Sequence, residues 1–278
     1  MVNALSIDVE DYFQVSAFAP HISRCRWDEI PCRVEDNIDR ILGLLEQNRV
    51  YATFFTLGWV AERYPGLVRR IVSGGHELAS HGYAHQRAGE LSPEAFFADI
   101  HLAKLVLEGI AGSEVKGYRA PSFSIGAGTL WALDCVEQAG YRYSSSIYPI
   151  VHDHYGMPNA PRFAYQSRQA LLEIPVTTVR LLRRNWPAGG GGYFRLLPYA
   201  VSRWCLRRVN GVDRQPAMFY FHPWELDPEQ PRIPGIGAKT RFRHYLNLSR
   251  MELRLRRLLG DFAWDRADRV FLERKRDG

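Results

Sequence analysis

Residues 38–57 read IDRILGLLEQNRVYATFFTL, and this stretch joins a helical pattern to a strand pattern. Its first apolar residues recur at the spacing of one helical face: Ile38, Ile41, Leu42 and Leu45. This spacing predicts an amphipathic helix, and the apolar run at residues 52–57 predicts a short buried strand. A helix that leads into a buried strand is the repeating unit of a parallel sheet with helical crossovers.

The same alternation runs along most of the chain. Further strand-like runs occupy residues 4–9, 77–80, 117–120, 141–144, 171–177 and 217–222. Further helices are predicted at residues 65–73, at residues 129–139, and after Ser92-Pro93, an N-cap followed by a proline in the first turn. This order predicts an α/β fold, either a barrel or a doubly wound sheet.

Composition excludes several classes of protein. The 278 residues are 46% apolar and 24% charged, which is typical of a globular protein and not of a disordered chain. No apolar run is long enough to span a membrane, and no signal peptide is recognisable, so a cytoplasmic protein is expected, with the inner face of the membrane as an alternative. The four scattered cysteines predict free thiols.

The net charge of +6 favours an anionic partner such as a membrane surface. No nucleic-acid-binding motif accompanies it, so a solvated basic face is the plainer interpretation and nucleic acid is not an expected partner. Oligomeric state is left open.

Two clusters carry residues that bind metals. Asp8, Glu10 and Asp11 lie at the end of the first predicted strand, and a nearby cation would relieve their mutual repulsion. His81 and His85 follow the third, and they can face one cation if the segment is helical or turns back at Gly82. Two imidazoles and a carboxylate suit a catalytic zinc, with cobalt, nickel or iron as alternatives.

Two further polar residues end predicted strands. Arg119 can hold a carboxylate by a forked hydrogen bond, and His222 ends an apolar run before Pro223-Trp224. Together with Asp8 and His81, each lies at the carboxyl end of a predicted strand. In a parallel β/α barrel these ends meet on one face, where active sites form, so one shared site explains all of them.

Three stretches have special composition. The glycines at residues 189–192 form either a flexible connector or a loop that approaches a ligand closely. Residues 226–237, with four prolines, predict an irregular loop. Residues 245–259 predict an amphipathic helix that docks on the main domain, with contact to an anionic membrane as the alternative.

In their order along the chain, these motifs resemble the polysaccharide deacetylase family, also called carbohydrate esterase family 4 or the NodB-homology family. The resemblance covers roughly residues 5–224, and its motifs are residues 6–11, 80–85, 118–121 and 221–222. The surrounding sequence resembles the branch found with bacterial exopolysaccharide and exosortase gene clusters, which carries an extra C-terminal region. The resemblance implies a distorted β/α barrel of about seven parallel strands at residues 1–225 and a helical extension at 226–278 packed on it.

The resemblance also implies a reaction: metal-assisted removal of N-acetyl groups from an amino-sugar polysaccharide or its lipid-linked precursor. In this reaction Asp8 would be the general base, oriented by Arg119, and His222 the general acid. His81 and His85 would hold the metal with one acidic residue, and both Glu10 and Asp11 remain candidates because Val9 separates Asp8 from them. Tyr12, Pro121 and Trp224 are predicted to contact the glycan.

At one position the chain departs from the family in a way that affects the chemistry. Ser144 stands where many relatives have an aspartate that tunes the acid histidine. Glu173, in the strand-like run between those of Ser144 and His222, is predicted to supply the missing charge. Two alternatives stay open: an amidohydrolase acting on a small non-sugar amide, and a catalytically weakened carbohydrate-binding barrel.

Overall fold

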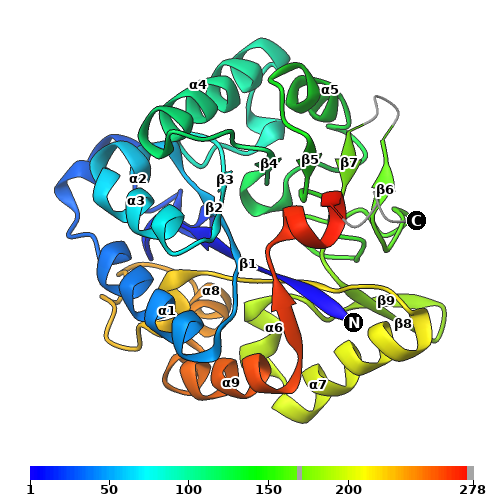
Figure 1. The fold of residues 1–278 in the computed structure, drawn as a ribbon. Helices are drawn as coiled ribbons and strands as arrows, with labels where there is room; N and C mark the ends of the chain where they lie inside the picture. Colours follow the sequence, from blue (N-terminus) through cyan, green and yellow to red (C-terminus); the bar gives the residue numbers. More distant parts are fainter. Residues whose placement is uncertain (168–170, 274–278) are drawn as a thin grey trace.

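The computed structural model describes residues 1–167 and 171–273 as a curled, mostly parallel sheet surrounded by helices (Figure 1). The strands of the main sheet are β1 (Val2–Val9), β2 (Thr53–Thr56), β3 (Glu77–Ser80), β4 (Gly117–Tyr118), β5 (Tyr143–Ser144), β6 (Tyr165–Gln166), β7 (Leu172–Glu173), β10 (Met218–Phe221) and β11 (Ala263–Asp265). They follow the order β10-β1-β2-β3-β4-β5-β7-β6, with β11 also paired to β1. All pairs are parallel except β6 with β7.

Irregular backbone bridges the gap between β7 and β10. The amide of Thr177 donates to the carbonyl of Met218 at 3.3 Å, and the amide of Tyr220 donates to the carbonyl of Gly189 at 2.7 Å. The sheet is thereby completed as a distorted barrel, as expected from the sequence. A separate antiparallel pair, β8 (Thr178–Leu181) and β9 (Arg184–Pro187), projects from this gap.

The helices are α1 (Val34–Asn48), α2 (Gly58–Arg63), α3 (Pro65–Ser73), α4 (Pro93–Ala111), α5 (Trp131–Gln138), α6 (Gly191–Leu196), α7 (Tyr199–Arg208), α8 (Ala238–Tyr245) and α9 (Leu248–Asp261). Every predicted strand and helix is present, with shifts of a few residues at the ends. The Ser92 hydroxyl accepts the Ala95 amide and caps α4, as expected. None of the helices in the described part of the chain is long and apolar enough to cross a membrane.

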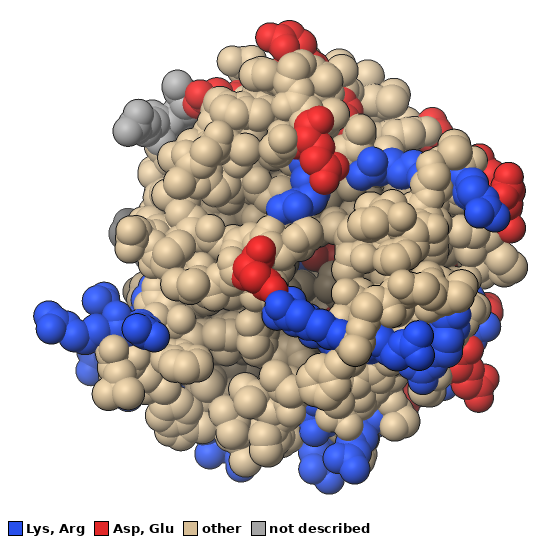
Figure 2. Space-filling view, turned by 180° about the vertical axis from the view of Figure 1, so that it is seen from behind, with Lys and Arg blue, Asp and Glu red and all other residues tan. Residues whose placement is uncertain are grey.

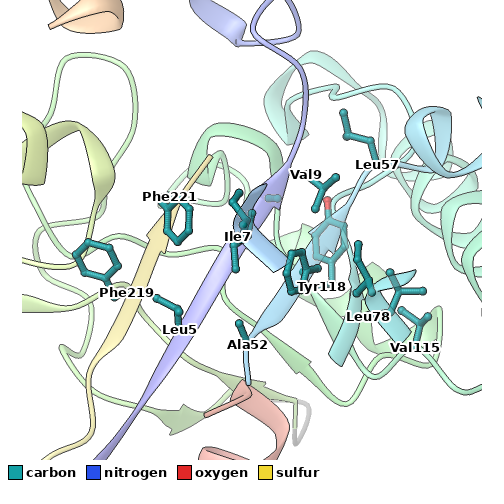
Figure 3. Close-up of a cluster of buried hydrophobic side chains, with 14 of the residues drawn as sticks. Leu5, Ile7, Val9, Ala52, Leu57, Leu78, Val115, Tyr118, Phe219 and Phe221 are labelled. Atoms are coloured by element: carbon teal, nitrogen blue, oxygen red, sulfur yellow. The ribbon is translucent and has the colours of Figure 1, made fainter. Parts of the chain in front are cut away.

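Side chains of β1 alternate between the two faces of the sheet. Leu5, Ile7 and Val9 point to one face, beside Phe219 and Phe221 of β10, and join the large core under the helices (Figure 3). The residues that alternate with them, Ala4, Ser6 and Asp8, face the barrel interior. This alternation turns Asp8 into the barrel.

The C-terminal segment closes the amino-terminal end of the barrel. Ala267, Val270 and Phe271 pack into the interior cluster, and the Ala267 amide donates to Thr53 Oγ1 at 2.8 Å. Thr53 begins β2, so this end of the barrel is filled and the carboxyl ends of the strands are left for a site. The extension also contributes β11 to the sheet, while the domain division after residue 225 stays a prediction and residues 274–278 lie outside the described part.

The amphipathic helix docks, as expected. The apolar face of α9 is buried on the barrel through Leu248, Met251, Leu255, Leu258 and Leu259, and is therefore not available to a membrane. All four cysteines are free, as predicted.

The glycines at 189–192 do not form a flexible connector. Gly191 begins α6, and a Cβ on it would lie 2.2 Å from Glu225 Oε1, while one on Gly189 would lie 2.4 Å from the Met218 carbonyl. Gly189 and Gly191 thus let the backbone approach other parts of this chain closely.

Candidate metal centre and active site

Glu10, His81 and His85 offer ligand atoms that all lie within 4.8 Å of one another, and all three residues are buried. Glu10 follows β1 and His81 follows β3, at the carboxyl ends of two strands that β2 separates in the sheet. His85 reaches the same point through a turn rather than a helix. Gly82 has φ 74° and His85 has φ 52°, so the segment turns back at the glycine.

The chemistry of this group fits a divalent metal. His81 Nδ1 donates a hydrogen bond to the Arg119 carbonyl at 2.8 Å. In this tautomer the lone pair of Nε2 is free to bind a metal. Burial lowers the pKa of His81 to about 4, so the ring is neutral. Glu10 Oε2 is buried without a hydrogen-bond partner, although it lies 2.6 Å from His85 Nε2. An orphaned carboxylate oxygen between two imidazoles is what a metal would satisfy.

Charge at Glu10 is also favourable for a cation. Burial alone would raise its pKa, but His85, His222 and His81 outweigh this effect and lower the pKa to about 2. Glu10 is therefore ionised at neutral pH.

Asp11, the other candidate ligand, lies outside this group. Its Oδ2 accepts hydrogen bonds from the backbone amides of Arg33 at 2.6 Å and Val34 at 2.9 Å. Its Oδ1 accepts one from the backbone amide of Tyr12 at 2.8 Å. Asp11 thus satisfies amides at the start of α1. The alternation of β1 explains the difference, because Glu10 continues the face of Asp8 while Asp11 continues that of Val9.

Asp8 and Arg119 form a buried ion pair inside the barrel. Arg119 Nη1 donates to Asp8 Oδ1 at 2.6 Å and to Ser6 Oγ at 2.9 Å. Its other nitrogens donate to the carbonyl and hydroxyl of Ser145, and its guanidinium lies 4.0 Å from the centre of the Phe55 ring. With these partners Arg119 is fully buried yet satisfied, and it fixes the Asp8 carboxylate beside the metal group.

His222 faces the same point from β10. Its Nε2 lies 3.6 Å from Glu10 Oε1 and 4.0 Å from Asp8 Oδ2. Its Nδ1 donates to Glu225 Oε1 at 2.8 Å, and Glu225 Oε2 accepts Arg195 Nε at 2.6 Å. Burial alone would lower the pKa of His222, but the carboxylates of Glu10, Glu225 and Asp8 raise it to about 9. The ring therefore carries a proton at Nε2 at neutral pH.

Glu225 occupies the position that was predicted for Glu173. Leu172 and Ile174 face the barrel interior, so Glu173 between them points to the outer face of the sheet. Its Oε1 accepts the amides of Ser146 and Ile147, each at 2.9 Å, and burial raises its pKa to about 6. The prediction that Glu173 lies beside His222 is wrong because it considered strand order and not strand alternation.

The three predicted glycan contacts are buried. Tyr12 is 2% exposed within an aromatic cluster with Phe13 and Trp27, which contradicts its expected place in a groove. Trp224 donates from Nε1 to Glu10 Oε1 at 3.3 Å and stacks on His222 with ring centres 5.0 Å apart, so it supports the site from within. Pro121 is also buried, at the start of a 3-10 turn after β4. The face of the molecule that lies behind the view of Figure 1 has a hollow, with atoms of Asp or Glu side chains at its base (Figure 2).

Two residues of this site were missed from the sequence. Glu225 follows His222 by three residues, and a 3-10 turn (Pro223–Leu226) brings its carboxylate back to both the ring and the amide of His222. That spacing after Pro223 was a usable signal. Arg195 comes from α6, thirty residues away, and carried no local signal.

Comparisons with known proteins agree with the fold. The family model described as "Polysaccharide deacetylase" matches residues 25–144, and the model described as "Domain of unknown function (DUF3473)" matches residues 145–272. The second model begins directly after β5, so the sheet is shared between the two matched regions.

Among curated relatives, a peptidoglycan-N-acetylglucosamine deacetylase of Bacillus cereus is 35% identical over 82 residues, which are 30% of this chain and 30% of that protein. A chitooligosaccharide deacetylase of Bradyrhizobium sp. is 39% identical over 61 residues, 22% of this chain and 26% of that protein. The matches thus span about a third or less of these relatives.

Among solved structures, one described as a polysaccharide deacetylase of Mycobacterium smegmatis superposes with a TM-score of 0.62 at 18% identity, covering 98% of this chain and 91% of that chain. A peptidoglycan deacetylase of Bacillus subtilis gives a TM-score of 0.51 at 13% identity, covering 99% and 92%. These similarities show a shared fold.

Proposed function

Because the chain belongs to the polysaccharide deacetylase family, we propose that it is a metal-dependent hydrolase that removes N-acetyl groups from an amino-sugar glycan. One arrangement carries this proposal. A buried Glu-His-His group lies beside an Arg-held carboxylate, Asp8, and a carboxylate-held imidazole, His222, whose Nε2 is 4.0 Å from Asp8 Oδ2. A general base and a general acid on either side of a metal site are what amide hydrolysis requires.

Glu10, His81 and His85 would hold the metal. When bound, a divalent metal supplies Lewis-acid polarisation of the acetamide carbonyl and lowers the pKa of water. Zinc is the first candidate for two imidazoles and one carboxylate, with cobalt, nickel or iron as alternatives.

The protein's own groups would move the protons. Asp8, whose Oδ1 is held by Arg119, presents its other oxygen, Oδ2, toward His222 and would take the proton of the attacking water. His222, protonated at Nε2, would give its proton to the nitrogen of the leaving amino sugar, which cannot leave as an anion. Glu225 would keep the ring oriented and its proton in place, the role that was assigned to Glu173 from the sequence.

The substrate class rests on the relatives. They are named for peptidoglycan and chitooligosaccharides, both polymers of N-acetylated sugars. An exopolysaccharide or its lipid-linked precursor, handled at the inner face of the membrane, is the substrate that the resemblance of the flanking motifs favours.

The decisive experiment is acetate release from N-acetylglucosamine oligomers by the purified, metal-loaded protein, with metal content measured in the same samples. We expect release that stops on chelation and returns with zinc. His222→Ala should keep the metal and lose about 10²–10⁴-fold in kcat. Turnover of small non-sugar amides alone would indicate the amidohydrolase alternative, and glycan binding with metal but without turnover would indicate a binding barrel.

A further inference from the structure

The hairpin surface, which we define as Arg180, Leu182, Arg183, Arg184 and Trp186 of the β8–β9 hairpin, exposes apolar and basic side chains together. Leu182 is 94% exposed and Trp186 is 51% exposed, whereas most large apolar side chains of this protein are buried. All three arginines are exposed, and none forms an ion pair with a carboxylate of the described residues. The hairpin is a two-stranded sheet outside the barrel, so the surface is a convex projection.

The turn of this hairpin is strained, and its sequence is unusual for the conformation. Leu181 pairs with Arg184, which leaves Leu182 and Arg183 as a two-residue turn with φ of 49° and 63°. Positive φ at both positions normally selects Asn-Gly, because a Cβ is disfavoured there. A leucine at such a position, fully exposed, benefits neither the turn nor the core. Residues held in this way point to a role outside folding.

Charge around the hairpin is one-sided. The segment from residue 178 to residue 214 contains a single acidic residue, Asp213, which pairs with Arg162 at 2.9 Å. The same segment contains eight arginines. Arg195 is buried against Glu225 and Arg203 pairs with Asp261 at 2.9 Å, which leaves six without an ion pair among the described residues: Arg180, Arg183, Arg184, Arg207, Arg208 and Arg214. Basic side chains protrude from the edge of the molecule where the hairpin lies, away from the central hollow (Figure 2).

Helix α7 lies beside the hairpin and continues the same composition. Val179 and Ala188 of the hairpin region pack against Cys205 of α7. The exposed side of this helix carries Trp204, which is 47% exposed, with the Arg208 guanidinium 6.0 Å from its ring. Tryptophan and arginine side by side are typical of surfaces that meet the headgroup layer of a bilayer.

We propose that the hairpin surface docks the protein on an anionic lipid bilayer. Leu182 would enter the headgroup layer. Arg183 on the same turn and Arg184, which directly follows it, would bind lipid phosphates through their forked guanidinium groups. A flat bilayer accepts a convex tip, whereas a protein partner would need a matching acidic pocket. The proposal uses no residue of the metal centre and goes beyond the proposed hydrolase activity.

Co-sedimentation of the full chain with vesicles tests this. We expect binding to phosphatidylcholine vesicles that contain phosphatidylglycerol, no binding to pure phosphatidylcholine, and weakening by salt. Arg183→Gln and Arg184→Gln should each reduce the partition coefficient about fivefold. On binding, Trp186 should shift the tryptophan emission to the blue, and Trp186→Phe should reduce that shift.

A second variant separates docking from folding. Leu182→Asn with Arg183→Gly gives the turn its preferred residues, so the melting temperature should stay the same or rise while vesicle binding is lost. The matched control is Leu105→Ser with Arg69→Gln, an exposed apolar and an exposed basic residue elsewhere, which should bind like wild type.

Equal binding to neutral and anionic vesicles, no binding by the wild type, or full binding by the turn variant would each overturn the proposal. Self-association that the turn variant removes, without vesicle binding, would assign the surface to a second copy of the chain instead. Acetate release from soluble oligomers should be unchanged in the hairpin variants. Vesicle binding by a protein that releases no acetate would therefore refute the proposed hydrolase and leave the docking intact.

Discussion

Glu225 accepts two hydrogen bonds from His222 through one carboxylate oxygen. Its Oε1 accepts the ring Nδ1 at 2.8 Å and the backbone amide of the same histidine at 3.0 Å. Burial would raise the pKa of Glu225, but Arg195 and His222 lower it to about 2, so the carboxylate stays charged. The charge and the geometry together keep a proton on His222 and direct Nε2 toward Asp8 and Glu10.

Replacement of Glu225 by glutamine should therefore affect protonation of the leaving group. We expect Glu225→Gln to lower kcat for an N-acetyl amino sugar about 10- to 100-fold. Hydrolysis of an aryl acetate should change little, because a phenolate leaves without being protonated. The ratio of the two rates within one preparation is the measurement, since it does not depend on the fraction of folded protein.

The matched control is Glu229→Gln, which changes an exposed carboxylate four residues further on and should leave both rates unaltered. If Glu225→Gln slows both substrates equally, its role is structural and the orientation of His222 does not depend on it.

Gly191 should be needed for the same contact. A Cβ at this position would lie 2.2 Å from Glu225 Oε1, whereas a Cβ on the adjacent Gly192 meets nothing within 4 Å. Alanine favours the helix at both positions, so any loss must come from displacement of Glu225. We expect Gly191→Ala to lower kcat for the amide at least tenfold, with a smaller effect on the aryl acetate, and Gly192→Ala to be neutral. Equal rates in the two variants would refute this packing argument.

Most of the fold could be predicted from the sequence because helix and strand patterns alternate clearly in it. The site could be predicted in part for the same reason: Asp8, His81, Arg119 and His222 each end a strand. Strand alternation held further information. Asp8 and Glu10 share a face by their spacing of two, which favours Glu10 over Asp11 without any structure.

Alternation also argues against Glu173, because it lies between the inward-facing Leu172 and Ile174. The short β8–β9 hairpin and Arg195 could not be predicted in the same way. Arg195 reaches Glu225 only through the tertiary placement of α6, and its guanidinium also donates to the His244 and Leu246 carbonyls beyond the barrel. Contacts of such long range have no periodicity or spacing that identifies them.

Substitutions of Glu10 and Asp11 should have separate effects, the first on metal binding and the second on stability. We expect Glu10→Gln to lose the metal with little change in the melting temperature of the metal-free protein. Asp11→Asn should keep the metal and lower the free energy of unfolding by about 1–2 kcal/mol, because a charged acceptor of backbone amides at the start of α1 is lost. Metal analysis and urea unfolding of both variants measure the two effects. Full metal content in Glu10→Gln would show that Glu10 is not a metal ligand, and metal loss from Asp11→Asn would show that Asp11 is one.

His76 should make the stability of the protein fall in weak acid. The ring is buried, its Nδ1 accepts the Ala52 amide at 3.2 Å, and burial followed by the charge of Arg266 lowers its pKa from 6.5 to about 4. The unfolded chain then binds more protons than the folded one between these two values, so the contribution to stability is complete above pH 6.5 and is lost as the pH falls toward 4. Between pH 8 and pH 5 this amounts to about 2 kcal/mol. Asparagine can accept the same amide without titrating, so His76→Asn should show a correspondingly shallower decline of the free energy of unfolding with pH, whatever its stability at pH 8. The exposed His101, replaced by asparagine, should decline in parallel with the wild type. If His76→Asn also declines in parallel, His76 does not control this transition.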